Sequence, residues 1–133
     1  MKKEEIFTLI VVILIIIGEI FSNMFNKKSM EEMEKRLEDF KMISIKNIEE
    51  KSISKEDMIG KVHELVSFWR GKVRVLAFFL EHEELENVEI QLNECISYLE
   101  VDEPEETISR IEEAIYNVNN IKDKQKVCLK NIF

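Results

Sequence analysis

The feature that most constrains this chain is the run IFTLIVVILIIIGEIFSNMF at residues 6–25, which is apolar almost throughout. A helix over this run would be about 30 Å long, which is the thickness of the hydrocarbon core of a bilayer. We therefore expect a short N-terminal tail at residues 1–5, a transmembrane anchor at 6–25 and a water-soluble domain at 29–133.

A cleaved signal peptide is the main alternative to an anchor, because Lys2 and Lys3 precede the apolar run directly. Signal peptidases cut where small residues occupy positions −3 and −1. Gly18 and Ser22 are small, but an isoleucine stands two positions before each of them. We therefore favour an uncleaved, single-pass anchor.

Lysines flank the apolar run on both sides, so the positive-inside rule gives little guidance on orientation. The tail at residues 1–5 is short and easily kept inside while a longer domain is exported. We expect a cell-membrane protein with its N-terminus in the cytoplasm and its domain on the extracytoplasmic side.

Glu19 is the only charged residue within the run. A carboxylate that faces lipid costs about 2–3 kcal/mol at the bilayer centre and less near an interface. Glu19 lies close enough to the end of the run for its side chain to reach the headgroups. The alternative is that it pairs with a polar group of a partner membrane protein, which makes Glu19 a candidate partner contact.

The domain behind the run is acidic. The chain has a net charge of −8, and its first 28 residues carry four lysines against three glutamates, so the remainder carries about −9. Nucleic acid and anionic lipid headgroups repel such a surface. We therefore exclude both as main ligands, and membrane lipid is expected to contact the protein through the anchor.

Residues 29–133 have the pattern of an all-α domain. The chain has three Gly and one Pro, too few breakers for a turn-rich β fold, and its apolar residues recur three and four apart. Ser29 and Ser54 each precede an acid by three residues, an arrangement that caps a helix start. The first helix is expected to end near Lys51, and the alternative to a start at Ser29 is that it continues directly from the anchor. Pro104 fits the first turn of a last helix, with Asp102 as its cap. The prediction is an N-terminal transmembrane helix followed by an antiparallel bundle of about four helices.

The second helix of the bundle is expected to be central, because it has the longest apolar stripe. The stripe is Met58, Val62, Leu65, Trp69, Val73, Leu76 and Leu80. Gly60 and Gly71 are interpreted as points of close helix approach. The stripe changes phase at His82 and Glu83, which predicts a bend, and the apolar residues 127–133 are expected to dock on the bundle. The same spacing is typical of coiled coils and also permits a homodimer.

The sequence has no motif for catalysis, a cofactor or a metal. His63 and His82 do not have zinc-site spacing, and the acids around Asp102 lack the pattern of an EF-hand loop. With a hairpin that turns near Asp102, Cys95 should face residues 108–110 of the last helix. Helix rise would then place Cys128 about 27 Å further along that helix, too far for a disulfide. We expect Cys95 in the core, and we expect no enzyme.

Trp69 is the single tryptophan of the chain, and the Phe78–Phe79 pair follows it near the end of the same stripe. Aromatic side chains at such positions either line a ligand pocket or pack in the core. Core packing is the favoured interpretation, and Trp69 is retained as a candidate site residue.

Several elements occur together in a known order: the apolar anchor, Trp69, the phrase FLEHEEL at 79–85, Val88 with Leu92, and the ending LKNIF at 129–133. In this order they resemble a family of small membrane-anchored helical proteins of spore-forming Gram-positive bacteria, domain of unknown function 4363. The resemblance implies an anchored helical domain with no known activity. Members are often encoded beside other membrane proteins, which implies a partner role.

The favoured function is a non-enzymatic interaction module that binds or regulates another membrane or envelope protein. The alternative is a sensor-like bundle that binds a small ligand between its helices. The candidate residues are Glu19, His82, Glu83 and Trp69. For His82 two hypotheses remain: a hydrogen bond that fixes the bend, or a contact patch with Glu83.

Overall fold

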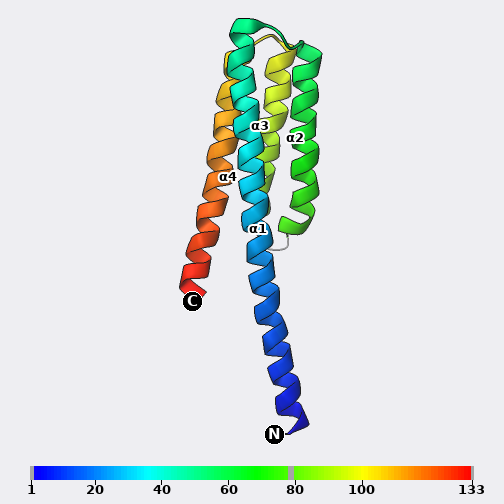
Figure 1. The fold of residues 1–133 in the computed structure, drawn as a ribbon, viewed down its shortest axis with the longest axis vertical. Helices are drawn as coiled ribbons and strands as arrows, with labels where there is room; N and C mark the ends of the chain where they lie inside the picture. Colours follow the sequence, from blue (N-terminus) through cyan, green and yellow to red (C-terminus); the bar gives the residue numbers. More distant parts are fainter. Residues whose placement is uncertain (1, 78–79, 133) are drawn as a thin grey trace.

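The computed structural model is all-α, as predicted. It describes residues 2–77 and 80–132, with side chains described up to Lys124. Within these ranges lie four helices and no strand: α1 (Lys3–Glu50), α2 (Lys55–Leu76), α3 (His82–Glu100) and α4 (Pro104–Ile132). They form an up-down-up-down bundle in which α1 extends far beyond its neighbours toward the N-terminus (Figure 1).

The helix α1 is continuous over 48 residues, from the apolar run to the far end of the bundle. The capping pattern at Ser29 therefore does not start a helix, since Ser29 is 2% exposed inside α1, and the alternative of a first helix that continues directly from the apolar run is the one observed. No Gly or Pro stands between Gly18 and the end of α1, so nothing interrupts the backbone hydrogen bonds once the helix has formed. The apolar segment and the first helix of the bundle are thus one continuous helix.

The turn between α1 and α2 is held by one side chain. Lys51 ends α1 in the left-handed conformation with φ 49°, and its N–H donates to Asn47 O at 2.9 Å. The Asn47 amide then bonds both backbone groups of Ile53: Ile53 N donates to Oδ1 at 2.9 Å, and Nδ2 donates to Ile53 O at 3.1 Å. The predicted cap at Ser54 is confirmed, since its Oγ accepts from Asp57 N at 3.1 Å.

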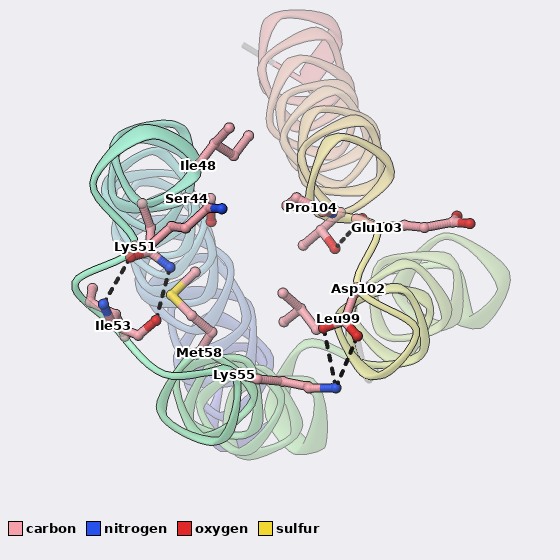
Figure 2. Close-up of a pocket in the computed structure, with 12 residues that line it drawn as sticks. Ser44, Ile48, Lys51, Ile53, Lys55, Met58, Leu99, Asp102, Glu103 and Pro104 are labelled. Carbon is pink, nitrogen blue, oxygen red and sulfur yellow. Dashed lines mark hydrogen bonds and ion pairs between the residues drawn. The ribbon is translucent and has the colours of Figure 1, made fainter.

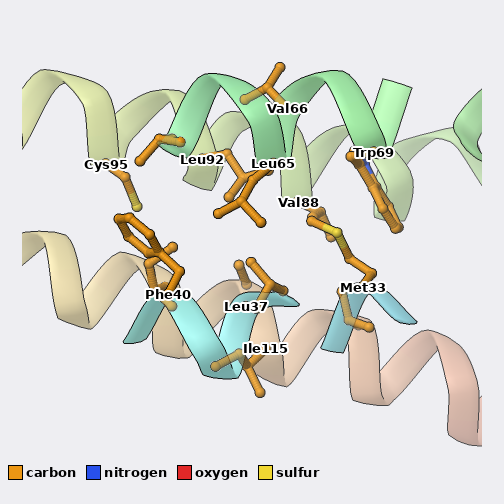
Figure 3. Close-up of a cluster of buried hydrophobic side chains, with 14 of the residues drawn as sticks. Met33, Leu37, Phe40, Leu65, Val66, Trp69, Val88, Leu92, Cys95 and Ile115 are labelled. Carbon is orange, nitrogen blue, oxygen red and sulfur yellow. The ribbon is translucent and has the colours of Figure 1, made fainter. Parts of the chain in front are cut away.

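The core lies between all four helices. Figure 3 shows it through Met33, Leu37 and Phe40 of α1, Leu65, Val66 and Trp69 of α2, Val88, Leu92 and Cys95 of α3, and Ile115 of α4. The predicted stripe of α2 is confirmed, with Val73 and Leu80 partly buried and the other five positions buried. The helices α3 and α4 form the predicted antiparallel hairpin.

Two local expectations are wrong. A Cβ added at Gly60 or Gly71 would meet nothing within 4 Å, so neither glycine permits a close helix approach. Asp102 does not cap α4, because that helix begins at Pro104 and Asp102 has a φ of 60°. The Asp102 carboxylate instead pairs with Lys55 of α2 at 3.2 Å.

A candidate membrane-facing site at the base of the bundle

The N-terminal part of α1 leaves the bundle with its apolar side chains exposed. The exposed large hydrophobic residues are Ile6, Phe7, Leu9, Ile10, Val11, Val12, Ile13, Leu14, Ile15, Ile16, Ile17, Ile20, Phe21 and Met24. The apolar core helix of a soluble protein would be buried, and this segment is not. Among the described residues it is the one segment long and apolar enough to cross a membrane, although a signal sequence near an N-terminus has the same character.

Glu19 lies in this exposed segment, as the sequence placed it, and its side chain is exposed. Further along α1 three polar residues are covered by the bundle, whereas Asn23 is partly exposed and Lys27 and Lys28 are exposed. Ser22 is 8% exposed, Asn26 1% and Ser29 2%. Asn26 Oδ1 accepts no hydrogen bond within the part of the chain that the structure describes. The transition from exposed to buried polar residues therefore marks the base of the bundle, where the apolar segment begins.

His82 and Glu83 lie at the same base. His82 is the first residue of α3, directly after the connection from α2, and both side chains are exposed. The next acid, Glu84, bonds Lys124 of α4, and this hydrogen bond raises the pKa of the Lys124 ammonium. The helix α3 begins at His82, the place where the sequence predicted a bend, and the roles of His82 and Glu83 stay predictions. His82 and Glu83 thus lie at the end of the bundle from which the apolar segment extends, and Glu19 lies within that segment.

Trp69, the fourth candidate, lies in the core. Its side chain is 0% exposed, and Nε1 donates to Leu85 O at 3.0 Å. This bond joins α2 to α3, the two helices that precede and follow the connection at residues 77–81. The other described side-chain bonds between these helices are the ion pair of Arg70 with Glu89 at 2.6 Å and the bond from Lys55 Nζ to Glu100 O at 3.2 Å, so none of the three involves His82. Trp69 packs as expected, and Phe78–Phe79 lie outside the described residues.

A group of cations and aromatic rings ties α1 to α2 just above the apolar segment. Lys72 Nζ lies 5.5 Å from the Phe25 ring and 5.3 Å from the Phe68 ring, and Arg36 Cζ lies 4.0 Å above Phe68. Glu32 pairs with both cations, at 3.5 Å from Arg36 and 4.0 Å from Lys72. The sequence carried no signal for this group, because its members come from two helices more than thirty residues apart.

A cavity of about 470 Å³ opens at the opposite end of the bundle (Figure 2). Its walls are Ser44, Asn47, Ile48, Lys51, Ile53, Lys55, Met58, Leu99, Asp102, Glu103, Pro104 and Thr107. Several polar groups in it already have partners within the chain: Ser44 donates to Phe40 O, Asn47 bonds Ile53, and Lys55 bonds Asp102. Sequence reasoning missed this cavity, since all four helices contribute to it.

The described residues offer no cluster of three or more His, Cys, Asp or Glu side chains that could hold a metal. Cys95 is a buried free thiol whose Sγ lies 3.6 Å from Thr107 O, close to the position expected for it on the neighbouring helix. Burial, reinforced by Glu94, raises the pKa of this thiol to about 12. The side chains of Cys128 and of the expected docking segment 127–133 lie outside the described residues.

Comparison with known proteins finds one family model, described as domain of unknown function (DUF4363), which matches residues 20–132. No curated protein sequence and no solved structure matches the chain. The matched range contains the whole bundle and begins at Ile20, directly after Glu19. Since the match covers most of the chain, the protein belongs to the DUF4363 family, as its sequence elements indicated.

Proposed function

We propose that this protein is a non-enzymatic helical module, anchored in the cell membrane by a single span, that binds or regulates another membrane or envelope protein. The observation that carries the proposal is the exposed apolar half of α1, which continues without a break into a packed, acidic bundle. A rigid helix through both parts holds the base of the bundle at a fixed distance from the bilayer. Glu19, His82 and Glu83 are then presented to a partner at the membrane surface.

The anchor is tested by fractionating membranes that contain the full chain at alkaline pH. The variant Ile13→Lys/Ile16→Lys places two charges in the apolar segment and should release the protein, because each lysine costs about 3 kcal/mol at the bilayer centre. The matched control is Met42→Lys/Ile45→Lys, at exposed apolar positions of the same helix within the bundle. Equal retention of both variants would contradict the anchor. A measured molecular mass lower than that of the full chain would show that a signal peptide has been cleaved.

The orientation is tested by protease treatment of wall-free cells that carry a C-terminal tag. An extracytoplasmic domain predicts that the tag is cut while a cytoplasmic control protein survives. A protected tag would place the bundle in the cytoplasm, and its partner would then be a cytoplasmic or membrane protein.

The partner role is tested by recovering the tagged full chain from membranes in a mild detergent after chemical cross-linking. His82→Ala should reduce partner recovery, because His82 lies at the base that faces the membrane. His63→Ala is the matched control, since His63 is exposed on α2. Both variants should keep the wild-type melting temperature. Equal recovery with both variants would remove His82 from the contact patch, and absence of any specific partner would contradict the module.

The second candidate function is a bundle that binds a small ligand, and the cavity at the far end favours it. Its volume of about 470 Å³ lies within the range of small-molecule sites, roughly 300–1,000 Å³. A ligand that binds only the folded form must raise the melting temperature. Such a shift in the wild type, lost in the cavity-filling variant Ile48→Trp, would support this function; a shift that persists in Ile48→Trp would place the ligand elsewhere.

A further inference from the structure

The polar residues of the apolar segment all lie on one face of α1. Residues 6–26 contain five polar side chains, which we call the polar stripe: Thr8, Glu19, Ser22, Asn23 and Asn26. At 3.6 residues per turn they fall within about 100° of the helix circumference. The remainder of the surface of this segment is formed by apolar side chains and Gly18. A segment that met only lipid would need no such separation of its faces.

The polar stripe continues the face of α1 that packs in the bundle. Upward from Ser22 and Asn26, the same face carries Met30, Met33 and Leu37, each 0% exposed. Downward it carries Glu19, which is exposed. The lower part of the stripe therefore continues the buried face of α1 into the exposed apolar segment.

Glu19 is the one ionisable group of the polar stripe, and it lies below the part of the stripe that the bundle covers. Glu19 makes no ion pair within the described part of the chain and is exposed among apolar side chains, where a carboxylate is costly unless it is paired or reaches the surface. Asn26 is 1% exposed and lies within the bundle, out of reach of a helix below it. Thr8 donates to Glu4 O at 2.9 Å, a bond within its own helix. The group left unpaired in the apolar segment is an anion, so a basic neighbour would match it.

We propose that the polar stripe binds one transmembrane helix of a different protein, that this helix carries a basic side chain at the depth of Glu19, and that it ends at the membrane surface beneath the bundle. This inference rests on the proposed function, in which the chain is an anchored interaction module. Charge complementarity selects the basic side chain, because Glu19 is the only ionisable residue between Ile6 and Phe25. In the hydrocarbon core such polar contacts hold helices together.

A second copy of this chain does not fit the stripe. The helix α1 is one continuous rod, and above the base its stripe face is covered by the rest of the bundle. A parallel copy seated on the stripe would drive its own α1 into those helices. It would also place Glu19 next to Glu19, which like-charge repulsion opposes. A helix that stops at the membrane surface avoids both conflicts.

The test is photo-cross-linking of the full chain in its own membranes, with a photoreactive phenylalanine analogue at one of two positions. Ile15 and Ile17 are a matched pair, 60% and 55% exposed. At 3.6 residues per turn Ile15 lies on the stripe face, and Ile17 lies about 160° away. We expect a cross-linked product from the probe at Ile15 and little from the probe at Ile17. The cross-linked peptide should be an apolar helix that contains Lys or Arg.

The role of Glu19 is tested by adding Glu19→Gln to each probe. Removal of the charge should lower the yield from the Ile15 probe by about tenfold or more, because it leaves a basic group unpaired in an apolar medium. The membrane-bound fraction should stay unchanged, since glutamine makes the segment no less apolar. An unchanged yield with Glu19→Gln would overturn the basic partner group.

Other outcomes separate this inference from the proposed function. A product of twice the chain mass, equal yields from both probes, or a peptide from a water-soluble domain would each overturn the partner helix on the stripe. If neither probe reacts but the partner is still recovered in a manner that His82→Ala weakens, the stripe fails and the interaction module stands. If neither probe reacts and no partner is recovered, both fail.

Discussion

Trp69→Phe isolates what one buried side chain contributes to the connection between α2 and α3. Trp69 is 0% exposed, and its Nε1 donates to Leu85 O at 3.0 Å. The phenyl ring keeps most of the apolar contacts and removes the donor. Leu85 O lies in the first turn of α3, where the helix supplies another donor, so no acceptor is left bare.

The expected loss of stability follows from two contributions. The hydrogen bond contributes about 1 kcal/mol when its acceptor keeps another partner. The smaller ring leaves a void in a closed core, which costs roughly 1–2 kcal/mol. The sum is about 2–3 kcal/mol, which in a domain of about 100 residues lowers the melting temperature by about 10 °C.

The assay is thermal unfolding of the full chain in detergent micelles, followed by far-ultraviolet circular dichroism, since the variant lacks the only tryptophan. The control is Tyr116→Phe, which removes a polar group from an aromatic side chain that is 67% exposed. It should change stability by less than about 0.5 kcal/mol. If Trp69→Phe melts within about 2 °C of the wild type, the reasoning fails, and Trp69 would belong to a surface or pocket rather than to the core.

Three further predictions concern the bundle. Asn47→Ala should lower the free energy of unfolding by about 2 kcal/mol, because two hydrogen bonds to Ile53 are lost. Asn47→Asp keeps the acceptor and should lower it by about half as much. Equal losses in the two variants would contradict the role of both hydrogen bonds. Gly60→Ala and Gly71→Ala should each raise the free energy of unfolding, measured in urea, by about 1 kcal/mol, since the added methyl group meets nothing within 4 Å. A lower free energy of unfolding would reveal a tight contact at the substituted position. In the variant Cys128→Ser, which leaves Cys95 as the only thiol, maleimide at pH 8 should react only after unfolding, because the buried thiol has a pKa of about 12. The same shift predicts that stability falls as the pH rises above about 9, since the unfolded thiol ionises first; rapid labelling of the folded protein would contradict both statements.

Some residues of the candidate site can be identified from the sequence, and others only from the structure. Glu19 stands out in the sequence because a single acid in an apolar run needs no structure to be noticed. Its neighbours in the polar stripe do not, because their shared face matters only once α1 is known to continue unbroken into the bundle. Similarly, Trp69 was expected in the core from its spacing, but its hydrogen bond to Leu85 requires the relative placement of two helices.

The sequence by itself determined the features that depend on neighbours three or four residues apart. These are the apolar segment, the helix starts at Ser54 and Pro104, and the burial of Trp69 and Cys95. Such features follow from helix periodicity and from caps that act within one turn. Local rules failed at Ser29, where a capping pattern lies in a chain with nothing to stop the helix that precedes it.

Only the tertiary structure decided what depends on helices far apart in the chain. Asp102 pairs with Lys55, 47 residues away, instead of capping its own helix. The cavity at the far end requires all four helices, and the exposed environment of Gly60 and Gly71 depends on which way α2 faces. The physical reason is that a repeating apolar stripe specifies which face of a helix is buried, whereas the rotation and height at which four such faces meet are set by the packing of their side chains against one another.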